Sequence, residues 1–179
     1  MNIVIYGDAS DTILSDLLTP ILARYGGVQV FSADKFICTP SGCTPKFFIY
    51  DINKMPYQSI IDGIFIFKDK FRKIDLSKVS NNVWHVVDSQ NIHAIKALQG
   101  SKNIVLTCGV DSKSTLTFSS RTATEALVNL QRFVKTQNKV LEPHEFTIKI
   151  TSTYDDNFVL LVCSVLLLAE IPSLEGFEI

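Results

Sequence analysis

The sequence has no excess of charge of either sign. Its 179 residues carry 17 Lys and Arg against 18 Asp and Glu, for a formal net charge of -1. Domains that bind nucleic acid usually carry a basic excess, so this balance argues against a nucleic-acid partner. The densest basic stretch, FRKIDLSK at 71–78, is short and contains Asp75, and it is interpreted as a solvated surface.

The sequence also lacks an apolar run long enough for a membrane span. Its longest, FVLLVCSVLLLAEI, covers residues 158–171, whereas a spanning helix needs about 20 apolar residues. This run is therefore predicted to be a buried core helix. The N-terminus has no Lys/Arg cluster and contains Asp8 and Asp11, so no secretory signal is expected. These features predict a cytoplasmic protein.

Cysteines are few, and their spacing does not make a metal site. Cys38 and Cys43 flank the turn-forming sequence TPSG, and whether they pair is left open. Two thiolates would supply half of a zinc site, but no second pair occurs at metal-site spacing. Cys163 falls inside the apolar run and is assigned to the core. No metal and no cofactor are predicted.

No linker rich in Gly, Ser or Pro and no internal repeat divides the chain, so a single domain over residues 1–179 is expected. Apolar periodicity predicts its elements. They are strands at 2–6, 60–67, 83–87, 104–107, 114–120, 126–134 and 140–150, a hairpin of 28–38 with 46–51, helices at 11–25, 91–98 and 155–171, and an acidic tail after Pro172. The fold class is α/β, with three layers, a mostly parallel sheet, flanking helices and an antiparallel strand extension.

The N-terminal segment MNIVIYGDASDTIL has the outline of a phosphate-binding loop, because a strand meets Gly7 and then a helix. In the motif G-x-x-x-x-G-K-[ST], the second Gly would fall on Thr12, the Lys on Ile13 and the Ser/Thr on Leu14. The dinucleotide motif G-x-G-x-x-G fails as well. A plain strand-to-helix turn with a Ser10 or Asp11 cap is the favoured interpretation.

Ligand binding at this turn stays an alternative. The helix N-terminus attracts anions, so Gly7, Asp8 and Ser10 are candidate ligand-binding residues. The carboxylates of Asp8 and Asp11 would oppose a phosphate there. This segment thus supports an α/β fold and argues against the nucleotide binding that usually accompanies it.

Two later strand ends carry the other candidate residues. In open α/β sheets, ligands bind beyond the carboxyl ends of the strands. Asp88 and Asn91 follow the strand WHVV, and Cys108 and Gly109 end the next one. Asp88 or Ser89 would equally serve as the cap of the following helix.

Two residues near these strand ends invite a catalytic interpretation. A nucleophilic Cys108 would need a base or a positive neighbour, and no local motif supplies one. His85, in the middle of a strand, is interpreted as a structural histidine. No catalytic residue is therefore assigned.

The later segments resemble the Mur ligase central domain. The resemblance rests on IVLTCGVDSKSTLTFSS, LVNLQRFVKTQNKVLEPHEFTIKI and DDNFVLLVCSVLLLAEI, and the order of elements over residues 83–171 fits. In that comparison WHVVDSQN is similar to the segment where those ligases carry Asn and Asp near the nucleotide. The early strand, loop and helix are similar to the opening of the domain.

The departures from that family decide what the resemblance implies. The ligase phosphate loop is absent, and the chain ends soon after the last helix. The resemblance therefore implies a shortened bacterial relative, a non-catalytic binding or assembly module with an unknown small-molecule or protein partner. The alternatives are an enzyme or nucleotide/small-anion binder with an unorthodox site at the strand ends, and a homo-oligomer.

Overall fold

A computed structural model describes residues 1–40 and 44–179 of the chain. Cys43, and with it the question of whether Cys38 and Cys43 pair, lies outside the described residues. The elements in chain order are β1 (Asn2–Tyr6), α1 (Ile13–Ala23), β2 (Gly27–Phe31), β3 (Phe36–Thr39), β4 (Pro45–Ile52), β5 (Ile64–Phe67), the 3₁₀ helix η1 (Leu76–Lys78), β6 (Trp84–Asp88), α2 (Ile92–Leu98), β7 (Ile104–Cys108), β8 (Leu116–Arg121), β9 (Glu125–Leu130), β10 (Val134–Lys135), β11 (Val140–Leu141), β12 (His144–Lys149), α3 (Asp156–Leu168) and β13 (Phe177–Glu178).

The chain forms two compact units that interleave in sequence. Unit 1 contains residues 1–87 and 91–105, and unit 2 contains residues 88–90 and 106–179. The expectation of a single domain over residues 1–179 stays a prediction.

Unit 1 is built on a mostly parallel sheet with the strand order β6-β5-β1-β4-β2-β3. β1 lies at its centre and pairs in parallel with both β4 and β5, and β2 and β6 continue the parallel arrangement on either side. Among the strands that the structure describes in this sheet, β3 alone runs antiparallel, beside β2. The prediction of a mostly parallel sheet in the first part of the chain is confirmed.

The predicted hairpin between 28–38 and 46–51 is wrong in its pairing. β3 forms an antiparallel pair with β2, its predecessor in the chain, through a turn at residues 32–35, where Ser32 and Lys35 exchange hydrogen bonds. β4 then crosses over and pairs in parallel with β2 and β1. The apolar pattern located these strands but carried no information on which strands pair.

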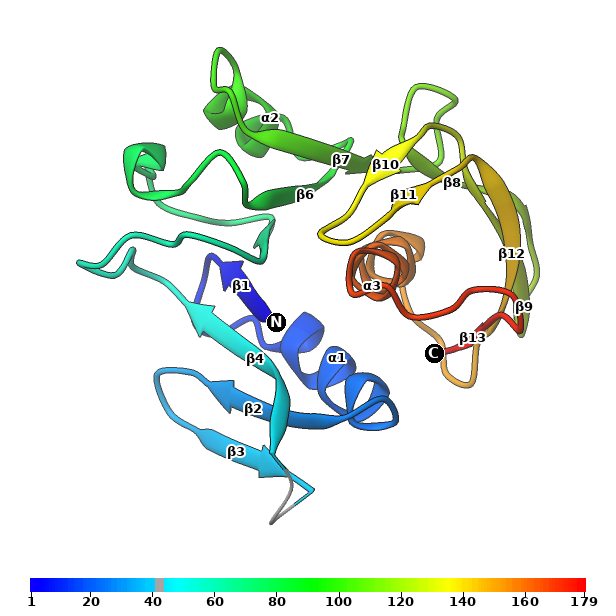
Figure 1. The fold of residues 1–179 in the computed structure, drawn as a ribbon, viewed down its shortest axis with the longest axis horizontal. Helices are drawn as coiled ribbons and strands as arrows, with labels where there is room; N and C mark the ends of the chain where they lie inside the picture. Colours follow the sequence, from blue (N-terminus) through cyan, green and yellow to red (C-terminus); the bar gives the residue numbers. More distant parts are fainter. Residues whose placement is uncertain (41–43) are drawn as a thin grey trace. The chain divides into compact units, whose positions relative to one another are not determined.

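Alternation along β4 separates the two faces of this sheet. Phe47, Ile49 and Asp51 are buried, and the intervening residues are half-buried or exposed. Asp51 bonds to Ser15 of α1, so α1 covers the face of the buried set, as Figure 1 shows. On the other face, α2 and η1 pack against a cluster that includes Val4 and Phe65. Within unit 1 the sheet therefore lies between two helical layers.

Helix α1 begins later than the sequence predicted. Its N-cap is Thr12, so neither Ser10 nor Asp11 caps it. Pro20 lies inside the helix, which continues to Ala23. Leu14, Leu17, Leu18, Ile21 and Leu22 are buried, as the apolar periodicity indicated.

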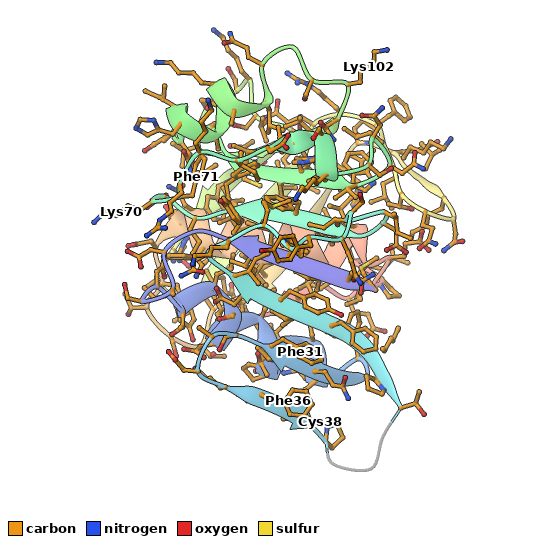
Figure 2. The ribbon with its side chains drawn as sticks, turned by 90° about the vertical axis from the view of Figure 1, so that its left-hand side faces the viewer. Phe31, Phe36, Cys38, Lys70, Phe71 and Lys102 are labelled. Atoms are coloured by element: carbon orange, nitrogen blue, oxygen red, sulfur yellow. The ribbon has the colours of Figure 1, made fainter. Side chains whose placement is uncertain are left out.

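A row of aromatic side chains lies on β2, β3 and β4, on the side of the sheet that faces away from α1. The Phe31 ring lies 5.0 Å from Phe36 and stacks on Tyr50 at 5.1 Å. Figure 2 shows Phe31 and Phe36 on adjacent strands at the β3 edge of the sheet. Phe36 is 64% exposed, so the row is open to solvent at this edge.

Unit 2 carries the antiparallel extension that the sequence predicted. β8, β9 and β12 pair antiparallel in the order β12-β9-β8, and they curve around α3 (Figure 1). α3 is buried along nearly its whole length, which agrees with the predicted core helix. The predicted acidic tail after Pro172 contains a short strand, β13, which pairs in parallel with β12. No helix in the described residues is long and apolar enough to cross a membrane.

Candidate functional site at the strand ends

The loop between β1 and α1 is organised around a buried lysine that follows β5. The Lys68 ammonium donates to the carbonyl of Asp8 at 2.8 Å and to the carbonyl of Asp11. It also pairs with Asp51 Oδ1 at 2.6 Å, and both side chains are almost fully buried. The interior of the loop is therefore filled by a cation from this chain.

Asp51 is held from a second side by α1. Ser15 Oγ donates to Asp51 Oδ2 at 2.7 Å, so each carboxylate oxygen of Asp51 accepts a bond. A buried ion pair costs desolvation free energy that only good geometry and further hydrogen bonds offset. Lys68 and Asp51 meet that condition, and their bonds connect β4, β5, α1 and the loop after β1.

Gly7 is required here by close packing. A Cβ at Gly7 would lie 2.5 Å from Lys68 Cβ and 2.7 Å from the carbonyl oxygen of Lys70. The Gly7 amide donates to the Ile52 carbonyl at 3.0 Å, and the Asp8 amide donates to the Lys70 carbonyl at 2.8 Å. The chain after β5 is thus held against the loop after β1 by backbone bonds that leave no room for a side chain.

Gly7→Ala is expected to lower the free energy of unfolding by about 1–3 kcal/mol, since an added methyl must displace backbone and not only a flexible side chain. Urea denaturation measures the loss. Gly100→Ala is the control. Gly100 has a φ of 78°, but no atom lies within 4 Å of an added Cβ, so this variant measures the cost of backbone strain in the absence of a steric clash. A Gly7→Ala variant as stable as the wild type would contradict the close packing.

The other candidate residues of this loop bond mainly to one another. Asp8 Oδ1 accepts from the amide and the hydroxyl of Ser10, both at 3.0 Å. These bonds lower the pKa of the Asp8 carboxyl, and the charges of Lys70 and Lys68 contribute further. Asp11 Oδ1 accepts from the Ile13 amide in the first turn of α1. The Asp8 carboxylate therefore occupies an amide of the loop, and the Asp11 carboxylate occupies one in the first turn of α1.

Asn91 also belongs to unit 1 and connects two of its segments. Its side-chain oxygen accepts from the Ala94 amide at 2.9 Å, which caps α2, and its Nδ2 donates to the Lys68 carbonyl at 3.1 Å. The predicted cap by Asp88 or Ser89 is therefore wrong. The α2 boundary itself, beginning after Asn91, agrees with the predicted helix at 91–98.

In unit 2, Asp88 lies at the end of β6 and bonds on both carboxylate oxygens. Oδ1 accepts from the Gln90 amide at 2.8 Å, and Oδ2 accepts from Asn157 Nδ2 at 2.6 Å. Asn157 lies in the first turn of α3. Within unit 2, Asp88 is thus held by the first turn of α3.

Cys108 and Gly109, at the end of β7, are closely packed against neighbouring side chains. The Cys108 thiol is buried and lies 2.9 Å from Ser164 Oγ of α3. Burial raises the pKa of Cys108 to about 12, against the lowering effect of Ser164, so the thiolate is disfavoured at neutral pH. A Cβ at Gly109 would lie 2.0 Å from Ser89 Oγ, which explains the glycine by close approach.

Sequence reasoning missed the charged and polar residues at the strand ends of unit 1, namely Asp51, Asn53, Lys68, Lys70 and Arg72. Asn53 follows β4, and Lys68, Lys70 and Arg72 follow β5. One signal was present: Asp51 falls at a position that the alternation of β4 assigns to the buried face. A buried carboxylate requires a partner, and a lysine after the apolar strand IFIF was the nearest candidate.

Metal ligation finds no support among these side chains. In the described ranges 1–40 and 44–179, no three His, Cys, Asp or Glu side chains converge as a metal site would require. The carboxylates nearest the strand ends are bonded to Lys68, Ser10 or Asn157 instead.

The chain is similar in structure to ligases of the Mur type. A murein peptide ligase from Psychrobacter arcticus aligns with 98% of this chain and 46% of its own, at 10% identity and a TM-score of 0.63. The UDP-N-acetylmuramate:L-alanyl-gamma-D-glutamyl-meso-diaminopimelate ligase from Neisseria meningitides aligns with 99% of this chain and 66% of its own, at 11% identity and a TM-score of 0.60. MurF ligase from Thermotoga maritima, in complex with ADP, aligns with 95% and 45%, at 8% identity and a TM-score of 0.57.

These likenesses show the fold. No protein-family model and no curated protein matches the sequence. The chain spans under half the length of the Psychrobacter and Thermotoga ligases and about two thirds of the Neisseria chain. The predicted α/β fold, resembling that of Mur ligases, is confirmed.

Proposed function

We propose that this chain is a non-catalytic binding or assembly module that keeps the Mur-ligase-like fold without using the loop at residues 7–12 as a nucleotide phosphate loop. The solved structures that it resembles include proteins from Thermotoga, Neisseria and Psychrobacter, which supports a bacterial origin. The cytoplasmic location expected from the sequence belongs to the same proposal.

The observation that carries the proposal is the position of the Lys68 ammonium. A phosphate loop directs backbone N–H groups at its anion. In this loop the carbonyls of Asp8 and Asp11 point at Lys68, and Asp51 balances the charge of that ammonium. An incoming phosphate would have to displace the Asp51 carboxylate from a buried pair, which costs several kcal/mol.

The side chains after the loop support the same conclusion. At the positions where a phosphate loop places Lys and Ser/Thr, this chain has Ile13, which is 52% exposed, and Leu14, which is buried. Neither side chain neutralises a phosphate or holds a magnesium ion. Ligation driven by ATP is therefore not proposed for this chain.

A thermal-shift series with ATP, GTP and UDP-sugars, each with and without magnesium, tests the proposal. We expect no magnesium-dependent shift and no release of ADP from ATP above buffer. The same series is run on a Lys70→Gln/Arg72→Gln variant, because these two exposed cations attract any polyphosphate. A magnesium-dependent stabilisation by ATP that persists in this variant, or ADP release, would overturn the proposal.

Assembly is a second candidate function, favoured by the aromatic row of Phe31, Phe36 and Tyr50, which is open to solvent at Phe36. Apolar rings at a sheet edge are a common feature of surfaces that bind a further protein. Light scattering reports the molar mass in solution. A dimer that Phe36→Ser converts to monomer would favour homo-oligomeric assembly, and a wild-type monomer would argue against it.

A further inference from the structure

A cavity of about 280 Å³ opens beside Gly7, at the carboxyl ends of three parallel strands. β1 leads into Gly7, β4 into Asn53, and β5 into the segment that contains Lys70 and Arg72. The lining residues are Gly7, Asp8, Ala9, Asn53, Lys70, Phe71 and Arg72. This cavity is separate from the interior of the loop that Lys68 fills.

Two cations on the cavity wall, Lys70 and Arg72, form no close ion pair within the described residues. Within the described part of the chain, the side chains of Lys70 and Arg72 make no hydrogen bond and no ion pair. Their neighbours Lys68 and Asp51 neutralise each other. Asp8 offsets part of the charge of Lys70, but neither Lys70 nor Arg72 is held in a close pair, so both can contact a ligand together with the side-chain amide of Asn53.

The segment that carries these cations is held in place. Between them lies Phe71, whose ring packs 5.1 Å from Phe67 and 6.1 Å from Tyr6. The Asp8 amide donates to the Lys70 carbonyl, which fixes the backbone on the other side. Figure 2 shows Lys70 and Phe71 close together in unit 1, away from Lys102. An anchored segment loses little freedom when a ligand binds.

We propose that this cavity binds the phosphoryl group of a small ligand, an inference that rests on the proposed function and names the ligand class of the binding module. The guanidinium fork of Arg72 matches two phosphate oxygens, and Lys70 adds a second positive charge. Two cations suit a phosphate monoester, which carries a charge of about -1.5 to -2 at pH 7. A volume of 280 Å³ lies just below the roughly 300–1,000 Å³ of pockets for drug-sized molecules, so the ligand is small.

Asp8 limits the affinity of this site. The Asp8 carboxylate lines the same cavity, so its negative charge repels a phosphate. Its Oδ1 accepts hydrogen bonds from the amide and the hydroxyl of Ser10, which hold the carboxylate against the loop. Asp8→Asn removes the negative charge and preserves the side-chain oxygen that Ser10 bonds. This variant is therefore expected to bind phosphate several-fold more tightly.

Isothermal titration with inorganic phosphate and with phenyl phosphate, at constant ionic strength, tests the inference. Arg72→Gln and Lys70→Gln are each expected to weaken binding about tenfold or more, as for loss of a charge-assisted bond. Lys102→Gln is the matched control: Lys102 is an exposed lysine of the same unit, outside the cavity, and this change should alter the affinity less than about twofold. Urea denaturation confirms that the variants are folded.

The outcomes separate this inference from the proposed function. Wild-type protein that binds neither phosphate compound, or Lys102→Gln that weakens binding as much as Arg72→Gln, overturns the phosphoryl site. Either result leaves the non-catalytic proposal intact, because that proposal depends on magnesium-dependent ATP binding and ADP release. Tighter phosphate binding by Asp8→Asn supports the site, because a partly unfolded variant would not gain affinity.

Discussion

Lys68→Met is expected to lower the free energy of unfolding by about 3–5 kcal/mol, the range typical of breaking one partner of a buried ion pair. The substitution removes an ammonium that bonds to Asp51 and to the carbonyls of Asp8 and Asp11. Asp51 would keep the bond from Ser15, but its charge would lie buried without a countercharge. The loop after β1 would lose its central bonds at the same time.

A double variant separates the charge from the hydrogen bonds. Lys68→Met/Asp51→Leu removes both charges, so no unpaired ion remains in the interior. We expect it to be more stable than Lys68→Met alone, although Ser15 and the two loop carbonyls lose partners. A double variant as unstable as the sum of the single variants would show that the pair contributes through bonds that do not depend on charge compensation.

Lys35→Met provides the matched control, because it breaks an ion pair of similar length at the surface. Lys35 lies 2.8 Å from Asp16, and their side chains are 40% and 54% exposed. Exposed pairs contribute about 0–1 kcal/mol, so the control should change stability little. Urea denaturation of these three variants and of Asp51→Leu measures the differences, and a Lys68→Met variant no less stable than Lys35→Met would refute the structural role of the buried pair.

The elements of this fold could be predicted wherever a local pattern decides them. β1 matches its predicted bounds at 2–6, and α3 was evident from an apolar run too long for a strand. The pairing of β2 with β3 could not be predicted in the same way. Strand order depends on contacts between distant residues, and a turn-forming sequence at 39–42 indicated a hairpin that the sheet does not contain.

At the candidate site, too, features set by neighbouring residues could be predicted, whereas contacts between residues distant in the sequence could not. Counting residues from Gly7 was enough to show that the phosphate-loop residues are absent. Nothing local to residues 7–12 indicates Lys68, which reaches that loop from the end of β5. Similarly, FRKIDLSK was interpreted as a solvated surface because its residues were considered alone, whereas Phe71 and Arg72 line a cavity with Gly7.

Gly7 itself shows how a local feature can have a different cause from the one it suggests. A glycine after the first strand of an α/β sheet is the usual sign of a backbone that approaches a phosphate. In this chain the backbone approaches Lys68 and Lys70 instead, at distances that exclude a Cβ. The segment therefore retains the geometry of the fold, while its interior is occupied by groups from the chain itself.

Acidification is expected to destabilise unit 1 through His85, before most carboxylates titrate. His85 is buried in β6, with its ring 5.5 Å from that of Phe65, and its Nδ1 lies 3.2 Å from the Val83 carbonyl. Burial lowers its pKa from 6.5 to about 4, against the raising effect of the bond to Val83. The neutral ring is thus the form that the folded protein holds.

Because the pKa of His85 is lower in the folded protein than in the unfolded chain, the unfolded chain binds the proton more tightly between pH 6.5 and 4. The stabilisation is complete above pH 6.5 and falls as the pH decreases through this window. Between pH 7.5 and 5 the expected loss is about 2 kcal/mol. Urea denaturation at half-unit pH intervals measures it.

Two variants assign that pH dependence to His85. His85→Phe places a ring that does not titrate beside Phe65, so the slope between pH 7.5 and 5 should flatten, whatever the stability at pH 7.5. His93→Gln changes an exposed histidine on α2 and should leave the slope as in the wild type. A His85→Phe variant that retains the wild-type slope would show that His85 takes up its proton without unfolding, and that the acid sensitivity arises elsewhere in the chain.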